Sequence, residues 1–114
     1  MSERRFIIEM GTGNSQQGRD YTRAAGRAIE DAIRHAKLSI LSALGIDDRD
    51  MRVQVTVGVQ KPEAVDCDAL VKLLPRGRHE VRAVFGGLDV TDPDTGAVTV
   101  VAQAAVEAFL PQRG

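Results

Sequence analysis

A short segment with three glycines holds the groups in this sequence that are best suited to chemistry. Residues 9–20 read EMGTGNSQQGRD and stand between an alternating apolar segment and a longer segment with helical spacing. Glycines ahead of a helix leave backbone N–H groups free, and neighbouring arginines add positive charge. The pattern favours a site for a small carboxylate or phosphate. The predicted ligand-binding residues are Gly11, Gly13, Asn14, Gln17, Gly18, Arg19 and Arg23.

The segment does not fit the common glycine motifs. GTGNSQQG is two residues longer than the dinucleotide fingerprint, and the acidic ribose ligand expected about 20 residues further on would fall inside the helical segment. No Gly-Lys-Ser/Thr follows, which excludes a P-loop. The alternative is a purely structural turn, in which the glycines supply positive φ angles and Asp20 caps the helix.

Two side chains of this segment are candidates for a catalytic role. Glu9 is the candidate general base, and Ser15 is the candidate nucleophile, although no His or Lys lies near Ser15 in sequence to activate it. No metal site is predicted, because His35 and His79 have no second ligand at metal spacing and Cys67 stands alone. No cofactor is predicted either.

The elements that must position these residues follow from hydrophobic periodicity. Segments 5–10, 51–59 and 79–85 alternate with a period of two and are predicted strands. In the first of them Phe6, Ile8 and Met10 share one side, while Ile7 and Glu9 share the other. Segment 20–44 has the apolar spacing of a long helix, and segment 63–75 predicts a shorter helix capped by an aspartate. Residues 88–101 predict two short runs joined by a turn, and 98–109 predicts the last strand, with an alanine-rich helix as the alternative.

The predicted fold is a single α+β domain over residues 1–114 with the order β-α-β-α-β-β. We expect a small mixed four-stranded sheet with both helices on one face. The other face mixes charged side chains with apolar ones, which favours a subunit interface or a ligand-lined surface over a core; a solvated sheet face is the alternative. On this assignment Glu9 lies on the uncovered face.

Composition excludes several classes of partner. The net charge of −1 gives no general attraction to nucleic acid or to anionic membranes, and no apolar stretch approaches the ~20 residues of a membrane helix. The start lacks the pattern of a secretory signal, and the lone Cys67 excludes an intrachain disulfide. We therefore expect a cytoplasmic protein that binds neither nucleic acid nor membrane.

The order of elements resembles the bacterial chorismate mutase-like fold, which is shared with the reactive-intermediate deaminases. That resemblance implies a trimer with ligand sites between subunits. More closely, the segments RFIIEMGTG, DYTRAAGRAIEDAI, VQVTVGVQKPEAVD and AQAAVEAF are similar to an uncharacterised Lin-type family of conserved hypothetical proteins with an N-terminal Gly-x-Gly-x-Asp-x-His-Gly signature. Here Ser15 and Gln17 stand at the Asp and His positions, and neither titrates near neutrality or is a good metal ligand.

The sequence thus predicts a small protein that binds an anionic or polar metabolite at an intersubunit site on loop 11–20. It leaves open whether a reaction occurs there. A homo-oligomer is expected, with a trimer favoured. The alternatives are a non-catalytic binding or regulatory module, in which the loss of the signature Asp and His is explained directly, and a subunit that uses its sheet face to bind another protein.

Overall fold

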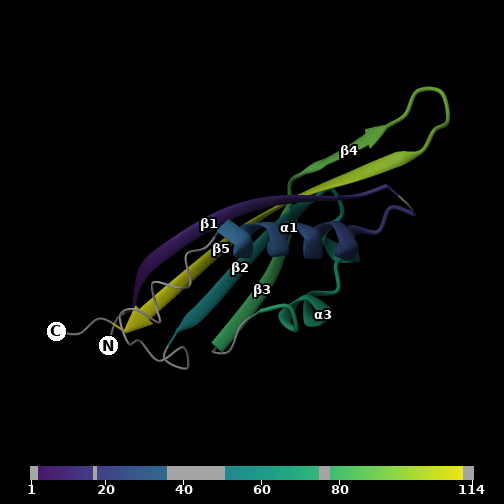
Figure 1. Ribbon diagram of the computed structural model, residues 1–114. Helices are drawn as coiled ribbons and strands as arrows, with labels where there is room; N and C mark the ends of the chain where they lie inside the picture. The colour runs from purple at the N-terminus through teal and green to yellow at the C-terminus, as the bar shows by residue number, and fades with distance from the viewer. Residues whose placement is uncertain (1–2, 17, 36–50, 75–77, 112–114) are drawn as a thin grey trace.

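The computed structural model describes residues 3–16, 18–35, 51–74 and 78–111, in which two helices lie against one face of a twisted sheet (Figure 1). The α+β class and the placement of both helices on one face are confirmed. The sheet has five strands where four were expected, because the short strand β4 also pairs with β5. The elements are β1 (Glu3–Ser15), α1 (Tyr21–His35), β2 (Arg52–Val59), the 3-10 turn η2 (Pro62–Ala64), α3 (Cys67–Val71), β3 (Arg78–Phe85), β4 (Leu88–Thr91) and β5 (Val98–Pro111).

Strand β5 is the centre of the sheet. The strand order is β1-β5-β2-β3, with β5 antiparallel to β1 and β2, and with β2 parallel to β3. Strand β4 pairs with the first residues of β5, ahead of the stretch that pairs with β2. The alanine-rich segment predicted as the last strand is therefore a strand, and every second residue of it from Val100 to Ala108 is buried. Strand β1 forms one outer edge; on the other side the outer strands are β3, beside β2, and the short β4, beside the start of β5.

Aspartates begin both helices: Asp66 caps the second as predicted, and Asp20 caps the first as in the structural alternative for the glycine-rich segment. The backbone N–H of Arg23 donates to Asp20 at 3.0 Å, and the N–H of Ala69 donates to Asp66 at 3.1 Å. The second helix is shorter than the expected 63–75, because it is divided into η2 and α3. The predicted continuation of the first helix over residues 36–44 lies outside the described residues.

Two glycines of the opening segment lie in β1, directly beneath α1, and not in a loop. A Cβ at Gly11 would collide with the backbone of Ala28 and Ala32, and one at Gly13 would lie 2.6 Å from the carbonyl oxygen of Ala24. Neither glycine has a positive φ. Both are needed because α1 presents alanine to the strand, so that helix and strand backbones come into contact.

The core lies between this alanine stripe and the covered face of the sheet. The fully buried residues include Ala24, Ala25, Ala28, Ile29 and Ala32 of α1 with Val53, Val55, Val57 and Val59 of β2. Leu70 of α3 joins the same cluster. None of the described helices is both long enough and apolar enough to cross a membrane.

The side assignment of β1 in the sequence was wrong. Since Gly11 faces α1 and strand residues alternate, Ile7 and Glu9 also lie on the covered side. Ile7 packs against the core, while Phe6, Ile8 and Met10 are 37%, 40% and 66% exposed on the uncovered face. Directly beneath α1 the helix-facing positions of β1 are Gly11 and Gly13, so hydrophobicity alone pointed to the other side.

Candidate functional site

The predicted site residues divide between a strand and a short turn. Gly11, Gly13, Asn14 and Ser15 belong to β1, so the strand covers half of the expected loop 11–20. Gly18 and Arg19 form the turn before α1, with φ angles of 67° and 51°. Arg23 follows in the first turn of α1, and Gln17 lies outside the described residues.

The start of α1 is already occupied by a carboxylate of the chain itself. Asp20 accepts the N–H of Arg23 through its side chain and the N–H of Ala24 through its carbonyl oxygen. This is the structural alternative that the sequence left open, in which Asp20 caps the helix. An anion near this end of α1 would therefore have to be held by side chains.

A polar hollow of about 370 Å³ lies beside this turn. It brings together the predicted residues Asn14, Ser15 and Arg23, and it adds Gln16 and Arg27, which the sequence reasoning missed. Arg27 could have been found by its spacing, because residues four apart share one helix face. The Arg27 guanidinium donates to the carbonyl oxygen of Asn14 at 2.7 Å, whereas within the described residues the Arg23 guanidinium has no ion pair or hydrogen bond. Ser15 is only 2% exposed.

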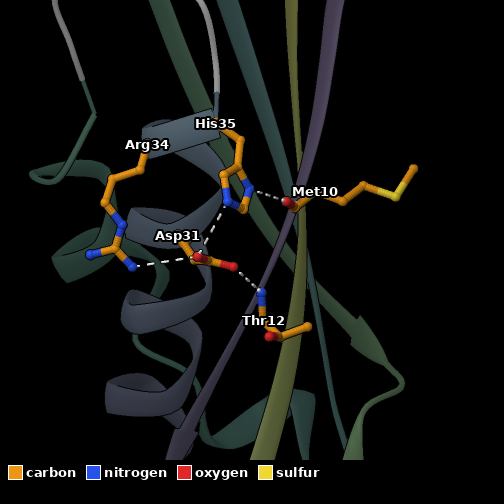
Figure 2. A network of polar contacts seen from close by, with 5 residues as sticks. All are labelled: Met10, Thr12, Asp31, Arg34 and His35. Carbon is orange, nitrogen blue, oxygen red and sulfur yellow. Dashed lines mark hydrogen bonds and ion pairs between the residues drawn. The ribbon is translucent and has the colours of Figure 1, made fainter.

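Three side chains of α1 reach the outer edge of β1 and contact its backbone, and Figure 2 shows two of them, Asp31 and His35. These residues, Arg27, Asp31 and His35, are here called the capping row. Asp31 accepts the N–H of Thr12 at 3.0 Å, and Nδ1 of His35 lies 3.3 Å from the carbonyl oxygen of Met10. With the contact from Arg27 to Asn14, the capping row meets every second residue from 10 to 14. It covers the part of the edge that lies beside α1.

Asp31 is the central member of the capping row (Figure 2). Its second oxygen lies 3.4 Å from the guanidinium of Arg34 and 3.8 Å from the ring of His35. The hydrogen bond from the Thr12 backbone, followed by those charged neighbours, holds the pKa of Asp31 below its ordinary value against the opposing effect of desolvation. The carboxylate therefore favours its ionised form in the folded protein.

A second, larger hollow of about 560 Å³ lies on the uncovered side of the sheet. Small residues such as Gly58 and Ala105 leave the space, and large exposed side chains stand around it, including Met10 and the 74% exposed Phe85. The full lining is Met10, Gly11, Thr12, Asp31, Thr56, Gly58, Val84, Phe85, Gly86, Gln103, Ala104 and Ala105.

Glu9, the candidate base, lines neither hollow. It pairs with Val106 on the covered side of the sheet, where the sequence had placed it on the uncovered side. Within the described residues no cluster of three or more His, Cys, Asp or Glu side chains is arranged to hold a metal ion. A catalytic role for Glu9 or for the buried Ser15 stays a prediction.

The sequence reasoning also missed a contact between α1 and β4. The Tyr21 hydroxyl donates to a carboxylate oxygen of Asp89 at 2.6 Å, and the Tyr21 ring is buried. The hydrogen bond to Asp89 and, after it, burial raise the pKa of Tyr21 above its ordinary value. The first residue of α1 is thereby attached to the hairpin that β4 and β5 form.

Comparisons with known proteins agree with this architecture. The chain is similar to a solved structure from Nostoc punctiforme PCC 73102, described as an FtsZ-like protein of unknown function, with 32% identity and a TM-score of 0.85. The similarity covers 98% of this chain and 99% of that one. No curated protein matches the chain. The sequence model of a family described as "Conserved hypothetical protein (Lin0512_fam)" matches residues 5–108, and the chain belongs to this Lin0512 family.

Proposed function

We propose that the protein binds a small molecule in the hollow on the uncovered side of its sheet. The observation that carries this proposal is the size and setting of that hollow, about 560 Å³ with an apolar rim. This volume falls in the range of about 300–1,000 Å³ that is typical of small-molecule sites. Large exposed apolar side chains gathered on one face are uncommon in proteins that bind nothing there.

The lining indicates the chemistry of the ligand. Most of it is apolar, and the hydrogen-bonding side chains include Thr12, Thr56 and Gln103. The Thr56 hydroxyl accepts a hydrogen bond from Nε of Arg82 at 3.0 Å, so its own hydrogen is left to donate to a ligand. Because the lining includes the ionised Asp31 and no cationic side chain, these groups suit an uncharged molecule with an apolar body and a hydrogen-bond acceptor, such as a carbonyl oxygen.

A fragment screen on wild type and on Ala105→Leu tests this proposal. Ala105 lines the hollow, and a leucine there would fill it without entering the core. In saturation-transfer NMR we expect fragments to bind wild type and to lose most of their signal with Ala105→Leu. Ala69→Leu, on the exposed surface of α3, is the matched control. The proposal is wrong if no fragment binds wild type or if both variants bind alike.

A second candidate function is the predicted binding of a small anion, for which we propose the polar hollow. It is favoured by the available guanidinium of Arg23 next to the anchored guanidinium of Arg27. Titration with inorganic phosphate and with small dicarboxylates, followed by calorimetry, should show binding that Arg23→Gln removes. Arg4→Gln, at the far end of β1, should bind like wild type. Equal binding by the two variants would contradict an anion site here.

The predicted homo-oligomer would change the surroundings of the larger hollow. A trimer that packs uncovered faces together, as the chorismate mutase-like resemblance implies, would enclose this hollow between subunits. That assembly stays a prediction, as does catalysis. Turnover of a ligand bound in the polar hollow that Ser15→Ala abolishes would support an enzyme; binding without turnover would support the regulatory or interaction module.

A further inference from the structure

The outer edge of β3 has backbone groups that face away from the sheet. On its inner side β3 pairs with β2. The N–H of Arg78 donates to the carbonyl oxygen of Met51 at 3.2 Å, and the N–H of Gly86 donates to that of Val59 at 2.9 Å, so the backbone groups of the even-numbered residues of β3 point toward β2. Since backbone groups alternate along a strand, those of Val81 and Ala83 point outward. Among the described residues, nothing bonds to these outward groups.

An edge of this kind can accept a further strand. Natural sheets commonly protect such edges with charged side chains, especially lysine, or with proline, bulges or covering elements. Residues 78–85 contain no proline and no lysine, and no register shift is found in the β2–β3 ladder. β3 carries three full charges: Arg78 is paired with Glu3, and Glu80 and Arg82 lie on the uncovered side next to Gln54 and Thr56. Their order decides which partner fits.

We propose that this edge pairs with the same edge of a second copy of the chain, antiparallel and centred on Val81. Pairing of identical antiparallel strands is two-fold symmetric, so each contact occurs twice. With the axis at Val81, the two Val81 residues exchange N–H···O bonds, and Ala83 of each copy meets position 79 of the other. Glu80 then stands directly opposite Arg82 of the second copy, and Arg82 stands opposite its Glu80.

This arrangement of charges is self-complementary. Directly opposite side chains have Cβ atoms about 4.5–5.5 Å apart, whereas the like charges lie on diagonals of about 7–8 Å. Glu80 has no ion pair within the described residues, and Arg82 uses only Nε, for Thr56, which leaves the ends of its guanidinium for a partner. Attraction between opposite charges therefore exceeds repulsion between like charges.

Neighbouring registers fit less well. An axis at Ala83 would place Arg82 opposite Val84 and leave Glu80 without an opposite charge. An axis at position 79 would place Glu80 opposite Arg78, whose guanidinium already binds Glu3 at 2.7 Å. The axis at Val81 uses both unsatisfied charges of the strand.

The pairing would join the two sheets into one and would bring the second copy next to the larger hollow. Position 78 of the second copy would stand opposite Val84, which lines that hollow. The inference is independent of the proposed ligand, because it depends on the β3 edge alone.

A charge exchange tests the pairing by sedimentation equilibrium of the full chain. Glu80→Arg and Arg82→Glu each place like charges opposite one another, and we expect the dimer Kd of each to rise by about tenfold or more. The double variant E80R/R82E restores opposite charges and should return the Kd to near the wild-type value. Glu30→Arg, the same charge change on the exposed side of α1, should dimerise like wild type. Circular dichroism verifies that each variant is folded.

Three results would overturn the proposal. These are a wild-type protein that stays monomeric at every concentration, single variants that associate as tightly as wild type, and a double variant that fails to recover. Ala105→Leu separates this question from ligand binding, since it should abolish fragment binding and leave the dimer intact.

Discussion

The outer edges of β1 and β3 satisfy their backbone groups in different ways. On β1, side chains of α1 contact the edge at Met10, Thr12 and Asn14. On β3, the outward groups of Val81 and Ala83 have no such cover among the described residues. The helix that builds the core thus also protects one edge, while α3 packs beside β3 without bonding to its outer backbone.

The difference follows from the side chains at the helix–strand contact. Gly11 and Gly13 let α1 lie close to β1, near enough for the capping row to reach past the strand to its edge. The short α3 presents Leu70 to the core and has no row of polar side chains in hydrogen bonds to β3. Close packing of small residues is therefore the condition for covering an edge from a helix.

The largest effect on the difference between the two edges is expected from a change that separates α1 from β1. Gly13→Ala places a Cβ against the backbone of Ala24 and Ala28, and we expect a loss of about 3 kcal/mol in the free energy of unfolding. Urea denaturation measures this loss. Gly26→Ala is the control, because its Cβ would meet only the side chains of Leu70 and Leu73, at 3.4 Å, and would improve helix propensity. Similar losses in both variants would mean that close contact with β1 is not what Gly13 provides.

A smaller effect is expected from releasing the first residue of α1. Tyr21→Phe removes the hydrogen bond to Asp89 and should reduce the free energy of unfolding by about 1–2 kcal/mol. The raised pKa of Tyr21 means that the wild-type advantage is complete below the ordinary tyrosine pKa of about 10 and is lost as pH rises through the folded value.

The sequence contains one tyrosine, so ultraviolet titration follows Tyr21 alone. We expect its midpoint to lie above the ordinary value in wild type and to return toward it in Asp89→Asn. A wild-type midpoint at the ordinary value would show that the contact does not persist in solution.

The smallest effect should come from removing one charge of the capping row. Asp31→Asn should lower stability at neutral pH by less than either change above, because the ion pairs of Asp31 are exposed to solvent. The pKa of Asp31 is lowered in the folded state, so its contribution is present above the ordinary value of about 4 and is lost as pH falls through the folded value. Denaturation curves of wild type and Asp31→Asn should converge on acidification. Glu30→Gln should track wild type throughout, and a difference that persists in acid would contradict the assignment.

Much of the fold was predictable because its signals are local. The unbroken alternation of residues 51–59 predicted β2, and the two helix caps follow from single aspartates. The side assignment of β1 failed because the apolar residues Phe6, Ile8 and Met10 lie on the uncovered face. Hydrophobic alternation indicates which side of a strand is apolar, whereas two core-side positions of β1 are the glycines Gly11 and Gly13.

The candidate sites were less predictable for a related reason. Asn14, Ser15 and Arg23 do come together in the polar hollow, since they flank one turn. The larger hollow combines β1, β2, β3 and β5, and that combination depends on a strand order that no local pattern specifies. The spacing of Arg27, Asp31 and His35 is visible in the sequence, but nothing local indicates that a strand edge is its target.

The number of contacts in the capping row is limited, because its spacing along α1 differs slightly from the spacing of its partners along β1. Four residues of α-helix advance about 6.0 Å, whereas two residues of strand advance about 6.6–6.8 Å. The displacement between each helix side chain and its backbone partner on β1 therefore grows by roughly 0.7 Å from one contact to the next. After about three contacts this displacement exceeds the range of donor–acceptor distances of a hydrogen bond. Three successive contacts, at Asn14, Thr12 and Met10, are formed. A longer α1 could not extend this cover along β1 unless the strand or the helix also bent.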